Sequence, residues 1–514
     1  MKFMITCFLA FFICTSTAYG NLYYVSENAA GKGDGTSYEN RMSVASHNAR
    51  SFNPGDTIYL CGTISNTPIN APSSGVKGKP ITYKSYDSDP ALLRDYSLSR
   101  GIIGFRGLHW IVIDGLEIRN ARIGISIVEG SSNIWVRRCH IQDVESAGIQ
   151  VADSTYITIG GAAEYGNRVY YAGYGTGACD YCFLRSDEVV FSYNKGIGDP
   201  SPFGRGSDGA TVQRCNNVLI EYNLFADHRA NYPTGEDGID LKGSTNIIVR
   251  NNIVYGNRMG GYKVNQSNPK VSCDTIVIYH NLAFDNGYNI SASGGDEEED
   301  HSNVFIWGNV FHSTNTGRNA GLHSQGDNFH FYNNTLYNPL SGEANIMLSR
   351  STNFHVKNNI FYNINSHRQL WVRVSPENVD SDYNLYWNPS RTSQNYWDGS
   401  WVPSTRIETN SVAVNPLFKD ATNTDFTLSE GSPAIGAGTP IKATPPDITV
   451  MGTTYSFDYG EILCPSTDWS TFPPKINTIN QRTLKGGWVM GAYGPYGNKP
   501  LSPPKIESIK MSDN

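Results

Sequence analysis

A short motif that ends in asparagine recurs through the middle of the chain, and it limits the possible folds more than any other feature. Segments such as VLIEYN, IIVRNN and FHVKNN each join a strand-like run to a terminal asparagine. A repeat of 25 to 30 residues is typical of a solenoid, in which each unit stacks on its neighbours. The asparagines are spaced by 29, 29, 29, 28, 25, 25 and 25 residues, at Asn194, Asn223, Asn252, Asn281, Asn309, Asn334, Asn359 and Asn384.

Each repeat contains two or three short alternating runs separated by polar turns. None contains an amphipathic pattern of helix length, which argues against leucine-rich, ankyrin and other helical repeats. A coil of three short parallel strands fits, with successive coils stacked about 4.8 Å apart. The sequence therefore predicts an all-β parallel β-helix with about 25–29 residues per coil. We expect the recurring asparagines to form an internal ladder at a bend.

Composition narrows the class of protein. The chain has 514 residues, of which 39% are hydrophobic and 17% charged, and this suits a soluble protein with a large core. The formal net charge of -7 argues against a nucleic-acid partner. It does not exclude an acidic polymer, because a bound metal can override the average charge. No segment after the N-terminus approaches the length of a membrane span. We expect a monomer.

The N-terminus has the features of a secretory signal peptide. Lys2 supplies the positive start, residues 8–13 (FLAFFI) an apolar core, and residues 17–20 (TAYG) small residues for cleavage. Cleavage after Gly20 would give an exported protein, either periplasmic or extracellular. The remainder is predicted to be one domain over residues 21–500, with a flexible tail at 501–514. Within it we expect first coils at 21–100, regular coils at about 105–390 and irregular coils at about 391–500.

Seven cysteines follow residue 20, at irregular spacings. An odd number in so long a chain does not form a disulfide framework. Cys179 and Cys182 form a single Cys-x-x-Cys pair with no second pair to complete a zinc site. A local disulfide or free thiols are therefore favoured over a metal site.

The repeat also aligns the runs that follow each asparagine. Alternation then separates residues that point into the coil from residues that point outward. The aligned runs are SDGATVQ (207–213), EDGIDLK (236–242), GGYKVNQ (260–266) and AGLHSQ (320–325). The inward set is Ala210, Val212, Ile239, Leu241, Tyr262, Val264 and Leu322. The set expected to face solvent is Thr211, Gln213, Asp240, Lys242, Lys263, Asn265 and His323.

This alignment places several acidic residues together. Asp208 stacks on Asp237, and Asp240 stacks on Lys263, so that these residues and Glu236 converge on one patch. Carboxylates this close repel one another, and a single lysine does not balance them. Ca2+ takes six to eight oxygen ligands, whereas Mg2+ demands stricter geometry and zinc prefers nitrogen or sulfur. A calcium site is favoured over a merely solvated acidic surface, because the acids are concentrated on two adjacent coils.

Three stretches of the chain resemble polysaccharide lyases of family 9, the pectate lyase group with a right-handed parallel β-helix. GEDGIDLKG (235–243), followed one coil later by GGYKVN, is similar to the calcium motif and the catalytic-lysine motif of that family. The resemblance implies Asp208, Glu236, Asp237 and Asp240 as calcium ligands and Lys263 as the catalytic base. Glu236 stands where the family usually has aspartate. The less specific stretches are NLYYVSENAAGKGDGTSYEN with NPGDTIYLCGT, and SEGSPAIGAG with WVMGAYGPYG.

The implied chemistry is β-elimination on an acidic polysaccharide. The C5 proton of a uronate lies next to its carboxylate, and bound calcium would stabilise the charge that develops when this proton leaves. Lys263 would take the proton, and Lys242 is the alternative base. Calcium would lower the pKa of Lys263 while Asp240 would raise it, and we expect a net fall. Polygalacturonate is the first substrate implied; rhamnogalacturonan, alginate and glycosaminoglycans carry the same acidic C–H.

Other side chains are candidates for contact with the polymer. Arginine can pair with substrate carboxylates, and aromatic rings can stack on sugars. The acidic run at 296–300 (DEEED) is interpreted as a solvated turn, with a second calcium site as the alternative. The substrate-binding candidates are Arg258, Tyr288, His323, Arg350, Trp371 and Arg373.

Two functions of other classes remain open. A β-helix glycoside hydrolase of the polygalacturonase type would use Asp237 and Asp240 as acid and base, without a metal. A non-catalytic adhesin or carbohydrate-binding solenoid is the other, because fold does not fix function. Turnover, a metal requirement and an unsaturated product distinguish the three.

Overall fold

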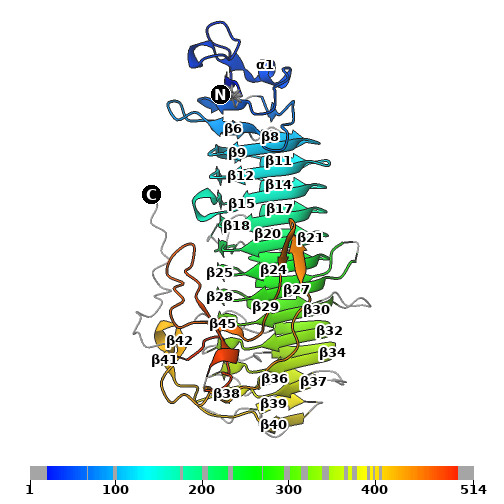
Figure 1. Cartoon of the computed structure of the whole chain (residues 1–514), viewed down its shortest axis with the longest axis vertical. Helices are drawn as coiled ribbons and strands as arrows, with labels where there is room; N and C mark the ends of the chain where they lie inside the picture. The colour runs from blue at the N-terminus through cyan, green and yellow to red at the C-terminus, as the bar shows by residue number, and fades with distance from the viewer. Residues whose placement is uncertain are drawn as a thin grey trace, which may run out of the picture.

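The computed structural model is a right-handed parallel β-helix whose coils stack along one long axis (Figure 1), as predicted. Almost every described element is a strand, and right-handed crossovers between parallel strands are the rule for L-amino acids. Each coil contributes one strand to each of three ladders, which we call the first, second and third ladders. The structure describes residues 20–65, 67–95, 101–173, 178–199, 206–229, 236–268, 270–293, 301–313, 322–338, 346–363, 368–372, 379–389, 394–397, 400–403, 408–484 and 486–495.

The first ladder carries the aligned acidic runs. Its strands are β5 (Ile69–Asn70), β8 (Gly101–Arg106), β11 (Ile123–Val128), β14 (Ala147–Ala152), β17 (Cys179–Leu184), β20 (Asp208–Gln213), β23 (Ile239–Lys242), β26 (Gly260–Asn265), β29 (Tyr288–Ser293), β32 (Leu322–Tyr332), β34 (Ile346–Lys357), β36 (Arg368–Val372) and β39 (Gln394–Trp397). β39 ends the ladder by pairing in antiparallel fashion with β40 (Ser400–Pro403).

The second ladder follows the first within each coil, and the long strands β32 and β34 belong to both. Its other strands are β1 (Leu22–Ser26), β3 (Thr57–Leu60), β6 (Ile81–Ser85), β9 (His109–Asp114), β12 (Ser132–Arg137), β15 (Thr155–Gly160), β18 (Asp187–Ser192), β21 (Asn216–Glu221), β24 (Thr245–Arg250), β27 (Asp274–Tyr279), β30 (His301–Trp307) and β37 (Val379–Asp382).

The third ladder closes each coil. Its strands are β4 (Thr63–Ile64), β7 (Leu92–Asp95), β10 (Glu117–Ala121), β13 (His140–Gln142), β16 (Arg168–Tyr170), β19 (Lys195–Ile197), β22 (Leu224–Ala226), β25 (Ile253–Tyr255), β28 (Leu282–Phe284), β31 (Val310–His312), β33 (Thr335–Asn338), β35 (Ile360–Asn363) and β38 (Leu385–Trp387). The first coils also hold β2 (Met42–Ser43) and the short helices η1 (Tyr38–Asn40) and α1 (Val44–Asn48), and η2 (Ala163–Tyr165) lies between β15 and β16.

The predicted asparagine ladder is confirmed. The Asn252 Oδ1 accepts the backbone N–H of Asn223 at 2.9 Å and the side-chain amide of Asn223 at 3.1 Å. The Asn252 amide in turn donates to Ile220 O at 3.0 Å and to Asn281 Oδ1 at 3.1 Å. The same pattern links consecutive asparagines from Asn167 to Asn384, so each bend has its buried polar groups satisfied by the next coil.

Inward and outward positions follow the predicted alternation, with one correction. The predicted inward side chains from Ala210 to Val264 are all buried in one continuous core. Of the residues expected to face solvent, Asp240 is only 1% exposed and Thr211 only 7%. Their side chains contact neighbours on their own strands, Asp240 with Lys242 and Thr211 with Asp208. Leu322 and His323 lie in β32, and their side chains are outside the described residues.

The C-terminal segment, for which we expect irregular coils at 391–500, continues the coils at the start of its described part, where β39 belongs to the first ladder and Val412 pairs in parallel with Leu385. From Phe418 onward its described part forms three hairpins that fold back along the flank of the helix, where the orange and red ribbon lies beside the green coils (Figure 1). The backbone N–H of Met451 donates to Glu188, and His280 Nε2 contacts Glu461 O at 3.0 Å. The elements are β41 (Phe418–Asp420), η3 (Ala421–Asn423), β42 (Asp425–Leu428), β43 (Ile448–Val450), β44 (Thr453–Tyr455), β45 (Glu461–Leu463), β46 (Thr478–Asn480) and η4 (Gln481–Thr483).

This return has a physical cause. Successive strands of the second ladder display Leu219, Ile248 and Val277 on their outer side, and an exposed apolar stripe of that length is unfavourable in water. Ile448 and Val450 of the returning segment pack against this stripe, and all five side chains are buried. A repeat pattern alone does not reveal which segment covers an outer face.

Three further expectations concern the ends and the cysteines. Cys179 and Cys182 form a disulfide bond, one of the two states that we favoured for this pair. In the described part of the chain, no helix has the length and apolarity needed to cross a membrane. The predicted signal peptide before Gly20 and the predicted tail at 501–514 lie outside the described residues.

We expect Asn252→Ala to lower the free energy of unfolding by at least about 2 kcal/mol, because it leaves buried amide and carbonyl groups of two coils without partners. Guanidinium unfolding followed by circular dichroism measures the change. Asn70→Ala, at an exposed asparagine of β5, is the control and should have little effect. Equal shifts for the two variants would show that the ladder is not a main source of stability.

A second prediction concerns pH. The His312 ring is buried between Phe284 and Phe426, and burial lowers its pKa to about 4. The unfolded chain therefore binds a proton more readily, and stability falls as pH drops from about 6.5 to about 4, by up to about 3 kcal/mol. His312→Phe should remove this part of the loss, measured as unfolding free energy against pH. His109→Phe, at an exposed histidine, is the control and should leave the pH dependence unchanged. If His312→Phe also left it unchanged, the loss of stability could not be assigned to His312.

Candidate functional site

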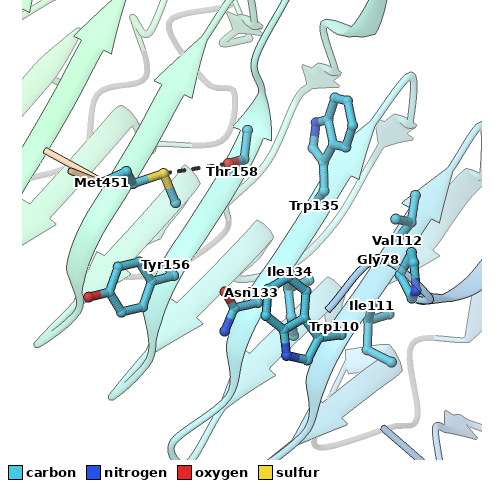
Figure 2. A pocket seen from close by; sticks show the side chains of 11 residues that line it. Gly78, Trp110, Ile111, Val112, Asn133, Ile134, Trp135, Tyr156, Thr158 and Met451 are labelled. Atoms are coloured by element: carbon cyan, nitrogen blue, oxygen red, sulfur yellow. Dashed lines mark hydrogen bonds between the residues drawn. The ribbon is translucent and has the colours of Figure 1, made fainter. Parts of the chain in front are cut away.

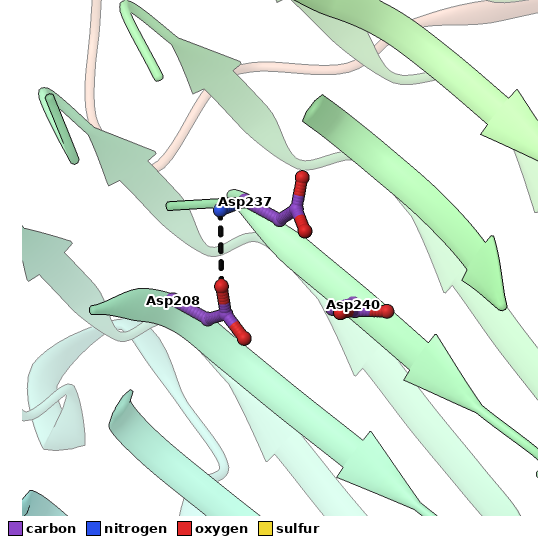
Figure 3. Close-up of side chains that lie close together, drawn as sticks. All are labelled: Asp208, Asp237 and Asp240. Atoms are coloured by element: carbon purple, nitrogen blue, oxygen red, sulfur yellow. Dashed lines mark hydrogen bonds between the residues drawn. The ribbon is translucent and has the colours of Figure 1, made fainter. Parts of the chain in front are cut away.

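Three aspartates form a compact cluster on the outer side of the first ladder. Asp208 is the first residue of β20. Asp237 lies two residues before the start of β23, and Asp240 lies within β23. One carboxylate oxygen from each lies within 4.8 Å of the other two (Figure 3). None of the three is more than 3% exposed. The register of the coils produces this cluster, because Ala210 pairs with Ile239 and so brings Asp208 beside Asp237.

Backbone donors hold these carboxylates in place. The N–H of Asp237 donates to Asp208 Oδ1 at 3.0 Å, and the N–H of Gly260 donates to Asp237 Oδ1 at 2.6 Å. Thr211 Oγ1 donates to Asp208 Oδ2 at 2.8 Å. A Cβ atom at Gly260 would lie 2.7 Å from the same Asp237 oxygen, so only glycine allows this approach. Gly260, the first residue of β26, is therefore part of the site.

Two lysines contact the cluster. The predicted pairing of Asp240 with Lys263 across the coils is confirmed, and the Lys263 Nζ lies 3.1 Å from Asp237 Oδ2. Lys242 lies off this column by register, opposite Asn265, but its Nζ is nonetheless 2.7 Å from Asp240 Oδ2 and 3.6 Å from Asp208 Oδ2. Residues i and i+2 of a strand share a face, so the spacing of Asp240 and Lys242 was the signal for this contact.

The electrostatics of the cluster follow from burial. Burial raises the pKa of Asp237 to about 7, with Asp240 adding repulsion and Lys263 opposing it. Burial also raises the pKa of Asp240, against the attraction of Lys242. Burial acts to lower the pKa of Lys263, but the surrounding aspartates outweigh it and the pKa is raised. The Asp240 Oδ1 is buried and has no hydrogen-bond partner among the described residues.

Glu236, which the family resemblance adds to the calcium ligands, is not part of this group of carboxylates in the described structure. Its Oε2 lies 3.1 Å from the Arg258 Nη1, and its side chain is fully buried. Its backbone adopts a left-handed conformation with φ of 82°. Arg258, a substrate-binding candidate, remains 39% exposed while it holds Glu236.

The other substrate-binding candidates are only partly described. Tyr288 begins β29 and pairs with Gly260, so it lies one coil beyond the cluster. His323 and Trp371 occupy the same outward column as Lys263 by backbone register, and Arg350 lies in β34. The side chains of His323, Arg350 and Trp371, the whole of Arg373 and residues 296–300 are outside the described residues.

A buried Asp–His pair that the sequence analysis missed lies behind the cluster. Asp180 on β17 is next to the strand of Asp208, and its Oδ2 lies 2.9 Å from the His228 Nε2. The His228 Nδ1 contacts Asn257 Oδ1 at 2.8 Å, and the Asn257 amide donates a hydrogen bond to Asn286 Oδ1 at 2.9 Å. Both members of the pair are fully buried. The signal was available: His228, Asn257 and Asn286 recur at the same 29-residue interval as the main asparagine ladder.

Comparison with solved structures finds similar folds. Pectate lyase Pel9A is 16% identical with a TM-score of 0.45, covering 83% of this chain and 93% of that one. An alginate lyase from Paenibacillus sp. str. FPU-7 is 16% identical with a TM-score of 0.42, covering 64% and 99%. Polygalacturonase from Erwinia carotovora ssp. carotovora is 10% identical with a TM-score of 0.39, covering 70% and 97%.

Comparison of sequences finds one short match to a curated protein. No family model matches the chain. The uncharacterized protein YwoF of Bacillus subtilis (strain 168) is 25% identical over 140 residues, which are 25% of this chain and 30% of that protein. The match therefore spans less than a third of that relative's length.

Proposed function

We propose that the protein is an exported, calcium-dependent polysaccharide lyase that cleaves a uronate-containing polymer by β-elimination, with Lys263 as the base. The observation that carries the proposal is the buried cluster of Asp208, Asp237 and Asp240 with the Lys263 amine at its edge. The similarity of GEDGIDLKG and GGYKVN to the motifs of family 9 lyases supports the same assignment. Polygalacturonate is the first substrate to test, and export would follow cleavage near Gly20.

The residues present fit a calcium ion. All three carboxylates offer oxygen, which is the ligand type that a hard cation prefers, and neither histidine nor cysteine belongs to the group. A buried carboxylate oxygen normally has a hydrogen-bond donor or a cation beside it. The Asp240 Oδ1 has no such partner among the described residues, which supports a cation at this position. Asp208, Asp237 and Asp240 would hold the ion.

Bound calcium would neutralise the aspartates and the substrate carboxylate, and so stabilise the charge that develops at C5. The Lys263 side chain is 24% exposed, so its amine can reach a polymer that lies along the outer face of the first ladder. Lys263, as the neutral amine, would accept the C5 proton, and the C–H electron pair would form the C4–C5 double bond. The C4–O bond would break, and its oxygen would leave with the bonding electrons and take a proton from water. Arg258, partly exposed beside the cluster, is placed to pair with a neighbouring uronate carboxylate.

Lys242 has a different role in this proposal. Its amine is held between Asp240 and Asp208, and the two carboxylates raise its pKa although burial opposes them. The aspartates raise the pKa of Lys263 in the same way, and the two lysine side chains are 26% and 24% exposed, so charge and burial do not separate them. The similarity of GGYKVN to the catalytic-lysine motif assigns the base to Lys263, and Lys242 would then compensate charge in the cluster.

The activity test uses polygalacturonate with calcium and then with EGTA. The wild type should form an unsaturated product that absorbs in the near ultraviolet, and EGTA should abolish it. Lys263→Ala should lower kcat about 10²- to 10⁴-fold, the range for loss of a general base. Lys419→Ala, at an exposed lysine, should retain full activity.

Other outcomes would redirect the assignment. Residual activity in Lys263→Ala with complete loss in Lys242→Ala would make Lys242 the base. Reducing ends released without ultraviolet absorbance would indicate a hydrolase that uses Asp237 and Asp240. Retention of polymers without shortening, repeated with alginate and glycosaminoglycans, would indicate a binding protein.

Calcium binding is tested separately, by titration calorimetry and by the thermal midpoint. Calcium at 100 times its Kd should stabilise the wild type by about 2.7 kcal/mol. Asp240→Asn keeps the shape of the side chain but removes its charge, and it should abolish this stabilisation. Glu236→Gln should preserve binding, because Glu236 lies outside the three-carboxylate group. Calcium binding unaffected by Asp240→Asn would place the ion elsewhere, and loss of binding in Glu236→Gln would restore four acidic ligands.

A further inference from the structure

A pocket of about 460 Å³ lies on the outer face of the second ladder, in the coils of β9, β12 and β15. Aromatic and apolar side chains form most of its lining, among them Trp110, Trp135, Tyr156 and Met451 (Figure 2). The pocket precedes the aspartate cluster along the helix and belongs to a different ladder. It is therefore separate from the proposed active site.

The pocket occurs where the cover from the C-terminal segment ends. From β18 onward, the outward side chains of the second ladder pack against that segment. Met451, in the turn between β43 and β44, reaches the edge of the pocket, where the Thr158 Oγ1 lies 3.8 Å from its sulfur. The outward positions of the preceding coils, Val112 and Trp135, are left without this cover and line the pocket.

The aromatic residues stand where the backbone favours asparagine. Strand register makes one residue of each strand in this ladder equivalent, the residue just before the first inward side chain. In the coils from β9 to β34 each of these residues has a left-handed backbone with φ between 49° and 57°. Asparagine tolerates this conformation, whereas a bulky aromatic residue is strained in it. The ten residues are Trp110, Asn133, Tyr156, Glu188, Asn217, Asn246, Thr275, Asn303, Asn328 and Asn353.

Six of these ten residues are asparagine, and the two aromatic ones are both in the pocket. Backbone strain at a defined position is a reason to look for a function there. Tyr156 is 46% exposed, so packing within the chain does not account for its ring. The β-helix imposes the left-handed backbone at these positions, and Trp110 and Tyr156 occupy two of them despite the conformational strain.

The Trp135 ring is held in a fixed orientation. The Trp135 Nε1 donates to Gly160 O at 2.7 Å, the Tyr165 ring packs edge-on against it at 5.0 Å, and the Arg137 guanidinium lies 4.5 Å from the ring centre. Trp110 and Tyr156 are separated by one intervening coil, and thus by about 10 Å at coil spacing. This separation is similar to the length of a disaccharide.

We propose that this pocket binds an uncharged segment of a polysaccharide, with pyranose rings stacked on Trp110 and Tyr156. The flat aromatic faces match the C–H faces of pyranoses, and the Asn133 amide and the Thr158 hydroxyl can bond sugar hydroxyls. No charged side chain is among the described residues that line the pocket, so it complements a neutral sugar rather than a uronate. The site would hold neutral regions of a polymer independently of any chemistry at the aspartate cluster.

The test measures binding rather than turnover. The probes are cellohexaose, xylohexaose and β-1,4-galactohexaose, titrated by calorimetry and by tryptophan fluorescence. Trp110→Asn with Tyr156→Asn installs the residue found at most equivalent positions, so the fold should be retained. At least one neutral hexamer should bind to the wild type and equally to Asp237→Asn, and the double variant should bind it at least 10-fold more weakly.

Thr275→Asn, at an equivalent position outside the pocket, is the matched control and should bind as the wild type does. The proposal is overturned if no neutral hexamer binds, or if the double variant binds as tightly as the control. It is also overturned if Asp237→Asn abolishes binding, because the sugar would then occupy the aspartate cluster. Failure of the lyase assay leaves these results unaffected, so the two proposals are tested independently.

Discussion

Parallel hydrogen bonding from one coil to the next sets the positions of nearly all side chains in this protein. It fixes the distance between equivalent residues at about 4.8 Å along the whole helix. The buried asparagine ladder keeps this register at the bends, because each side chain bonds both the backbone and the amide of its neighbour. Residues 29 positions apart, such as Asp208 and Asp237, are consequently brought into contact.

The aspartate cluster shows what such a fixed register makes possible. Three carboxylates that would repel one another in a flexible chain are held together by backbone N–H groups and by the absence of a side chain at Gly260. Lys242 and Lys263 balance most of the charge, and one oxygen of Asp240 is left without a partner. The rigid scaffold thus holds three carboxylates in place beside only two lysine amines, so the cluster carries excess negative charge.

The outer surface of the helix is shaped by a second constraint. A solenoid with apolar residues on an outer face must cover them, and the returning C-terminal hairpins do so from β18 onward. Where that cover stops at Met451, the aromatic side chains of the preceding coils line an open pocket. One segment therefore both protects the later coils and defines the end of the second candidate site.

The β-helix, the asparagine ladder, the inward residues and the pairing of Asp240 with Lys263 could all be predicted from the sequence, because they follow from a repeat of known period. The positions of side chains that depart from that period became apparent only in the folded structure. Folding brought the Lys242 amine into the cluster, paired Glu236 with Arg258, and laid the hairpins that begin at Phe418 back along the flank. The reason is physical: register is local and periodic, whereas burial of a charge or of an outer apolar face depends on which distant segment covers it.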